Sequence, residues 1–239
     1  MNKLIIIVST LLISFSSNSQ THKITYNYKI LEDEVMLKND LLKDIFLENI
    51  KAANNIKFNL DFNDTISRFK IQEIMASDEL DIDGAIATSG CQKEIFTFNK
   101  KTYRNNAESL FNENEYLIVD SIEKNWKYTN EKKLIDGYEC YKATTENIIK
   151  NSYGEFHHPV IAWYCPEIPY QYGPAGYGGL PGLILQLQVR YNLFGAEKIE
   201  LNSTNKKLLK IPNQGEVISN ELFNKKISDI MENRFKNKN

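Results

Sequence analysis

The chain has 239 residues, of which 42% are hydrophobic and 25% charged, and its formal net charge at pH 7 is −2. A chain of this length and composition can bury a substantial core. Its acidic and basic residues are interspersed, without the basic stripe that a phosphate backbone attracts, so we expect no nucleic-acid partner.

The N-terminal residues read MNKLIIIVSTLLISFSSNSQ, in which Lys3 is followed by an apolar run that ends at Phe15. This run is shorter than the roughly 20 apolar residues of a membrane-spanning helix, and Ser17 and Ser19 suit cleavage before Gln20. Residues 1–19 are therefore predicted as a secretory signal peptide, with a retained N-terminal anchor as the alternative. We expect an exported mature chain without a transmembrane segment, located in the periplasm, at the outer membrane or outside the cell.

The first part of the mature chain shows two different periods of hydrophobicity. Residues 23–30 alternate between apolar and polar side chains, which predicts a strand. Residues 40–50 carry apolar side chains three to four positions apart, which predicts an amphipathic helix. Residues 56–62 and 65–75 alternate again on either side of a turn-forming Asn-Asp pair, which predicts a hairpin.

Short alternating segments continue through the rest of the chain and end in a helical pattern. The expected strands cover residues 93–99, 115–122, 125–130, 137–149, 159–165, 183–189 and 197–201. Strands at this spacing indicate a meandering antiparallel sheet. Residues 218–235 have apolar side chains near helical spacing and predict a C-terminal helix. We therefore expect a mainly β fold: a curved antiparallel sheet or half-barrel, packed against one or two helices and formed by residues 20–239 as a single domain.

A glycine-rich stretch, GPAGYGGLPGLILQLQ, occupies residues 173–188. Pro181 and Gly182 suit the two central positions of a type II turn, which would lead into a strand whose leucines belong to the core. The remaining glycines form a loop that either contacts a ligand or packs tightly against another backbone.

The hexapeptide Gly179-Leu180-Pro181-Gly182-Leu183-Ile184 is the signature for which the GLPGLI family of exported Gram-negative proteins is named. Gly137-Tyr138-Glu139-Cys140 and Ala162-Trp163-Tyr164 also resemble the family pattern, whereas Cys165 stands where a small polar residue is expected. The resemblance covers residues 137–187. It implies export and the fold, and it brings no established activity, catalytic residue or cofactor.

Three cysteines, at positions 91, 140 and 165, allow at most one intramolecular disulfide. If residues 137–149 and 159–165 are the arms of a hairpin that turns at residues 151–154, Cys140 and Cys165 face each other at a distance that a disulfide spans. Cys91 is then a free thiol, or else the alternative partner.

His157 and His158 are the only adjacent histidines. Neighbouring strand residues point to opposite faces, so we expect these two side chains not to chelate one metal ion, and we predict no metal site. No arrangement of nucleophile, base and carboxylate stands out along the chain, and no residue is assigned a catalytic role.

The chain has 13 tyrosines and 12 phenylalanines, which fill a core or form a recognition surface. We predict that Gly179, Pro181 and Gly182 shape the turn, and that Trp163, Tyr164 and Tyr177 contact a ligand or partner beside it.

The favoured function is a noncatalytic binding module without a cofactor, which binds a hydrophobic small molecule or an envelope protein. The alternatives are an exported hydrolase of peptide or glycan, with Glu155, His157 or His158 near the glycine loop, and an accessory subunit of an outer-membrane transport assembly.

Overall fold

The fold is known from a computed structural model, which describes residues 20–72, 82–106, 115–151, 154–203 and 209–236. The predicted signal peptide and the end of the strand expected over 65–75 lie outside these ranges. No helix within the described ranges combines the length and the apolar character needed to cross a membrane.

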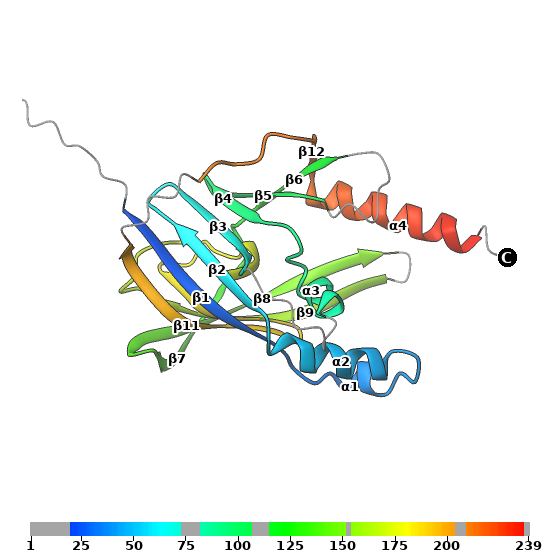
Figure 1. The fold of residues 1–239 in the computed structure, drawn as a ribbon, viewed down its shortest axis with the longest axis horizontal. Coiled ribbons are helices and arrows are strands. Elements are labelled where there is room, and N and C mark those ends of the chain that lie inside the picture. Colours follow the sequence, from blue (N-terminus) through cyan, green and yellow to red (C-terminus); the bar gives the residue numbers. More distant parts are fainter. Residues whose placement is uncertain (1–19, 73–81, 107–114, 152–153, 204–208, 237–239) are drawn as a thin grey trace, which may run out of the picture.

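Strands account for most of the regular structure in the described ranges (Figure 1). They are β1 (Thr21–Ile30), β2 (Lys57–Phe62), β3 (Ile66–Ile71), β4 (Ile95–Phe98), β5 (Lys101–Asn105), β6 (Tyr116–Ser121), β7 (Lys127–Ile135), β8 (Tyr138–Asn151), β9 (Gly154–Cys165), β10 (Leu183–Val189), β11 (Asn192–Ser203) and β12 (Glu216–Ser219).

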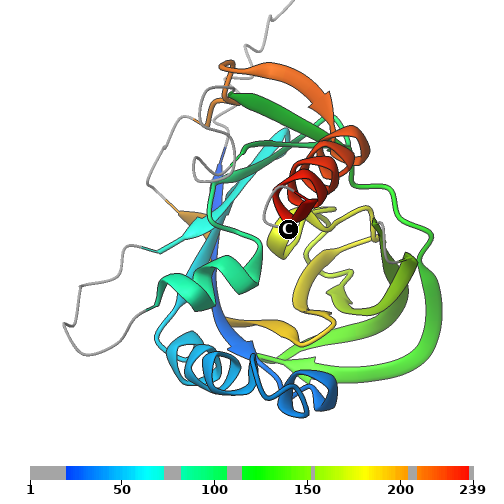
Figure 2. The same ribbon diagram turned by 90° about the vertical axis from the view of Figure 1, so that its right-hand side faces the viewer.

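Within the described residues, these strands form one 12-stranded sheet in the order β12-β6-β5-β4-β3-β2-β1-β11-β10-β9-β8-β7. The sheet thus consists of two meanders, β1 to β6 and β7 to β11, joined where β1 pairs antiparallel with β11. All neighbours pair antiparallel except β12, which adds parallel to β6 at one edge. Figure 2 shows the sheet curling around a central axis, so the predicted mainly β, curved sheet is confirmed.

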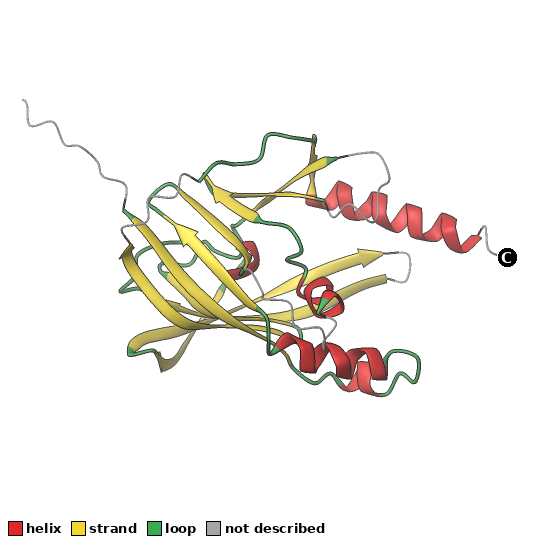
Figure 3. Cartoon of the chain, in the orientation of Figure 1, coloured by secondary structure: helices red, strands yellow, loops and turns green. Residues whose placement is uncertain are grey.

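Four helices accompany the sheet in the described part of the chain (Figure 3). They are α1 (Glu34–Leu37), α2 (Lys43–Ala53), α3 (Asp83–Ser89) and α4 (Asn220–Lys236). The helix expected over 40–50 begins at Lys43 because Asn39 organises a turn before it, accepting a hydrogen bond from Leu41 N–H at 3.0 Å. Phe46, Ala52 and Ala53 form the buried face of α2.

The predicted C-terminal helix is present as α4, directly after β12. Its Phe223 packs against Tyr116 and Ile118 of β6 and Ile218 of β12, which forms a small second apolar cluster. β5, β12 and the short helices α1 and α3 were not expected, because short elements with polar sequences carry little periodic signal.

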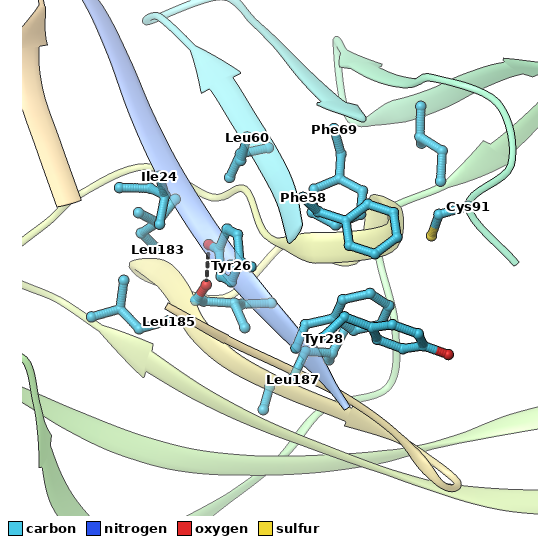
Figure 4. Packing of buried hydrophobic residues seen from close by; sticks show 14 of the residues in the cluster. Ile24, Tyr26, Tyr28, Phe58, Leu60, Phe69, Cys91, Leu183, Leu185 and Leu187 are labelled. Atoms are coloured by element: carbon cyan, nitrogen blue, oxygen red, sulfur yellow. Dashed lines mark hydrogen bonds between the residues drawn. The ribbon is translucent and has the colours of Figure 1, made fainter. Parts of the chain in front are cut away.

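The inside of the curled sheet is filled at its centre by side chains of the expected first strand and its neighbours (Figure 4). The largest fully buried aromatic side chains are Tyr26, Tyr28, Phe58, Phe62, Phe69 and Phe194. Phe58 and Phe69 stack with ring centroids 5.1 Å apart. The Tyr26 hydroxyl donates a hydrogen bond of 2.7 Å to the Ile184 carbonyl, so β1 and β10 are connected across the inside of the sheet.

The leucines that follow the glycine loop are core residues, as predicted: Leu183, Leu185 and Leu187 are fully buried. The register of β10 against β9 shifts between Ile184 and Gln186. This bulge breaks strict alternation along β10, which is why Ile184 is fully buried as well.

The turn before β10 is not the type II turn that the sequence predicted. Leu183 N–H donates to the Ile168 carbonyl at 2.9 Å instead of to Leu180, and Gly182 N–H closes a tighter turn onto the Leu180 carbonyl at 2.8 Å. Gly182 has a φ of 159°, far from the value near +80° that the third position of a type II turn requires. Glycine is needed here for close approach, since a Cβ at Gly182 would collide with the Cys165 carbonyl.

We predict that Gly182→Ala destabilises the protein by about 2 kcal/mol, because the added methyl group forces the loop away from the backbone of β9. Urea denaturation measures the change. Gly195→Ala on β11 is the matched control, because a Cβ there meets no atom within 4 Å. Equal stability of the two variants would contradict the close approach at Gly182.

Candidate functional site

A cavity of about 410 Å³ lies at one end of the curled sheet. It is lined by residues of the glycine loop, the end of α3, the strands β4, β5, β6, β8, β9 and β11, the turn between β10 and β11, and the first residue of α4. Figure 1 shows α3, α4 and the β8–β9 hairpin projecting at this same end. The volume lies within the range of about 300–1,000 Å³ that is usual for small-molecule sites.

The cavity borders the aromatic core, which gives it an apolar side. Phe194 and Ile95 line it and are almost fully buried. Cys91 lies beside them, and burial raises the pKa of its thiol to about 12, so this cysteine is protonated at neutral pH and is a weak nucleophile.

The other side of the cavity is polar and mostly cationic. Arg104 of β5 donates a hydrogen bond of 3.0 Å to the Asn220 side-chain oxygen, and burial lowers the pKa of its guanidinium. Lys124 Nζ lies 3.3 Å from an Asp120 carboxylate oxygen. Arg190 Nε lies 3.2 Å from an Asp33 carboxylate oxygen.

The glycine loop forms one wall of the cavity. Gly176 has a φ of +77°, and a Cβ at this position would lie 3.0 Å from the Thr102 side chain and 3.1 Å from the Ile95 side chain. Trp126, in the connection between β6 and β7, anchors the loop, because its indole N–H donates to the Gly178 carbonyl at 3.0 Å. The loop therefore packs tightly, which is one of the two predicted uses of its glycines, and Gly176 also lines the cavity. Contact of the loop with a ligand stays a prediction.

The three predicted contact residues do not lie together. Tyr177 lines the cavity, and its ring packs edge-on against Trp126. Trp163 faces a different side of β9, where Lys133 Nζ lies 4.2 Å from its ring centroid. Tyr164 is 8% exposed and packs between Tyr128 and Tyr141.

The predicted hairpin register is confirmed for the described residues of β8 and β9. Tyr141 pairs with Tyr164 and Lys142 pairs with Trp163, which brings the fully buried Cys140 and Cys165 to neighbouring positions. Burial and then the neighbouring Cys165 raise the pKa of the Cys140 thiol to about 12. Both are reduced, as is Cys91 in the cavity wall, so their disulfide stays a prediction.

The adjacent histidines point to opposite faces of β9, as expected. His157 is exposed and lies between two carboxylates, 2.8 Å from Glu146 and 3.0 Å from Glu155. His158 lines the cavity, where burial and then the charge of Arg190 lower its pKa. Within the described ranges, no three His, Cys, Asp or Glu side chains are grouped to hold a metal ion.

A second polar cluster at the other end of β1 was not predicted. The Asn202 backbone N–H donates to His22 Nδ1 at 3.0 Å, so the imidazole proton resides on Nε2, which contacts the Tyr170 hydroxyl at 2.8 Å. That hydroxyl in turn donates to Asp64 at 3.1 Å. The sequence carried no signal for this chain of hydrogen bonds, nor for the cationic wall around Arg104, because their members lie on distant elements.

Comparisons with known proteins add the following. A family model described as "Protein of unknown function (Porph_ging)" matches residues 155–186, which include β9, the glycine loop and the start of β10. This short match is consistent with the resemblance of the hexapeptide to the GLPGLI family. No curated protein matches the chain.

Two solved structures of PNGF-II, from different crystal forms, have a similar fold, each with a TM-score of 0.51 and 16% identity. They align with 87% and 88% of this chain, which spans 32% and 33% of their length, about a third of each. At so low an identity, the structural similarity shows a common fold and carries no information about activity.

We predict that mild oxidation with oxidised glutathione links Cys140 to Cys165 and leaves Cys91 free. Closing the loop between these residues stabilises the protein by about 3 kcal/mol. Peptide mapping after alkylation identifies the bridge, and Cys91→Ala, as the control, retains it. A bridge to Cys91 would contradict the hairpin geometry.

The pKa values of the three histidines are expected to depart from the ordinary value of 6.5 in different directions. Hydrogen bonding to Glu146 raises the pKa of His157, whereas burial lowers the pKa of His22 and of His158. Because the folded protein protonates His22 less readily than the unfolded chain does, this group reduces stability as the pH falls below about 6.5. NMR titration of the ring protons measures the three values, and a His157 value below the other two would contradict the structure.

Proposed function

We propose that this chain is an exported, noncatalytic binding protein of the GLPGLI type, and that its ligand occupies the cavity beside the glycine loop. The observation that carries the proposal is the cavity itself: about 410 Å³ of space with an apolar side formed by Phe194 and Ile95 and a polar side formed by charged residues. Sites for small molecules commonly combine an apolar lining with a few convergent polar groups.

The position of the cavity supports a small molecule with both apolar and polar groups over a purely hydrophobic one. Aromatic side chains fill the centre of the curled sheet, so the apolar interior is occupied by the protein's own core. The remaining space lies at the end of the sheet, where Tyr177, Asn192 and Arg104 provide polar groups. A ligand there would rest its apolar part on Phe194.

The reactive groups around the cavity support binding over catalysis. Burial keeps the Cys91 thiol protonated, and Lys124 and Arg190 are already in contact with carboxylates. The hydrolase alternative relied on Glu155, His157 and His158, and these do not converge: His157 and Glu155 contact each other on the exposed hairpin, while His158 faces the cavity.

We predict that the mature protein, purified gently from its own cell envelope, carries a small molecule that is lost on denaturation. Asn147→Trp should abolish this added mass, because Asn147 lines the cavity and a large ring there fills it. Ile148→Trp is the matched control: it is the next residue of β8, is 48% exposed and points to the opposite face. Native mass spectrometry of the wild type and both variants provides the measurement.

The other outcomes of this experiment are equally informative. A protein companion in place of a small molecule would favour the transport-assembly alternative. A bare wild-type chain, or equal loss of the ligand in both tryptophan variants, would contradict the proposed site.

A further inference from the structure

The charges that line the cavity are unbalanced. Among the described lining residues, Arg104, Lys124 and Arg190 are cationic, and Asp120 is the carboxylate. Lys124 is neutralised by Asp120 at 3.3 Å, and Arg190 is neutralised by Asp33, which approaches from outside the cavity, at 3.2 Å. One positive charge, that of Arg104, is left over.

Within the described residues, Arg104 has polar and aromatic contacts but no ion pair, and the Asp120 carboxylate acts on it only from beyond contact distance. Its guanidinium donates to the Asn220 side chain at 3.0 Å and lies 6.0 Å from the Phe223 ring centroid. No carboxylate oxygen in the described part of the chain lies within 4.0 Å of a guanidinium nitrogen of Arg104, which is the distance that defines an ion pair. Burial lowers the pKa of this guanidinium, yet an arginine stays charged in proteins, so the described residues leave a partly desolvated cation without a counter-ion in direct contact.

A cation in these surroundings is suited to bind an anion. A guanidinium has five N–H donors in a planar fork that matches a carboxylate or phosphate, and one interaction with Asn220 leaves most of them unused. Removal from bulk water strengthens the attraction to an anion and makes the uncompensated charge costly. Asp120 opposes an incoming anion only weakly, because its carboxylate is engaged by Lys124 and by the Ser121 N–H at 2.8 Å.

We propose that the cavity binds a small molecule that bears a carboxylate or phosphate group, and that Arg104 holds this anionic group. The proposal deepens the proposed function and depends on it. The apolar part of the ligand lies against Phe194 and Ile95, and the Tyr177 hydroxyl, kept protonated because burial raises its pKa, is available as a further donor.

Calorimetric titration with three probes of the same ring size tests this inference. Benzoate and phenyl phosphate carry the two anionic groups, and benzyl alcohol is the neutral counterpart. For the wild type we expect the better anion to bind at least tenfold more tightly than benzyl alcohol, with an affinity that falls as salt is added. Whichever of benzoate and phenyl phosphate binds more tightly identifies the anionic group that the site prefers.

Three variants assign the preference to Arg104. Arg104→Gln should lower the affinity for the anions at least tenfold and leave that for benzyl alcohol unchanged. Arg104→Lys keeps the charge and should retain part of the preference. Lys101→Gln is the matched control, since it removes an exposed positive charge from the opposite face of the same strand and should change nothing.

The outcomes separate this inference from the proposed function. Equal binding of the anions and benzyl alcohol by the wild type would overturn the anion site and leave a binding cavity in place. Anion binding that survives in Arg104→Gln would likewise overturn the role of Arg104. If no probe binds and native mass spectrometry shows a bare chain, the binding function itself fails. The wild-type comparison stands even if Arg104→Gln does not fold.

Discussion

The pairing of β1 with β11 is the interaction on which the rest of the structure depends. It joins two meanders that are each local in sequence into one sheet, and it pairs two strands that lie far apart along the chain. The aromatic side chains of β1 then fill the inside of the curl, and the Tyr26 hydroxyl reaches β10 to hydrogen-bond the Ile184 carbonyl. Because the core occupies the centre of the curl, the cavity lies at the end of the sheet, beside the end of α3 and the first residue of α4.

The glycine loop connects this core to the cavity. At the C-terminal end of the loop, Gly182 lies so close to the Cys165 backbone that no side chain fits. The strand that begins directly after this contact, β10, places its leucines in the core. Nearer its start, Gly176 lies against Thr102 and lines the cavity. One segment therefore serves packing and site formation together, which explains why several glycines occur in so short a stretch.

The charge of the cavity depends on which of its side chains form ion pairs, and not on the net charge of the whole chain. Overall the chain is slightly acidic, with a formal charge of −2, yet the described charged residues that line its cavity are three cations and one carboxylate. Two of the cations form ion pairs with carboxylates, whereas Arg104 forms none with the described residues. A partly buried charge without a partner is costly to the folded protein, and a bound anion would remove that cost.

The sequence by itself determined the features that depend on local pattern. These are the strands of both meanders except β5, the helices α2 and α4, the Cys140–Cys165 register of the β8–β9 hairpin and the burial of the leucines of β10. Alternating and helical patterns of hydrophobic residues predict these features, because each feature depends on residues that are close together along the chain. The tertiary structure alone decided how far the sheet curls, the turn at Gly182 and which residues meet at the candidate site. The cavity is lined by residues of separate elements, among them Arg104, Asp120, Tyr177 and Arg190, whereas Trp163 and Tyr164 do not line it. The spacing of residues along the chain does not predict which of them come together here. That depends on how far the twisted sheet curls before side chains fill its core.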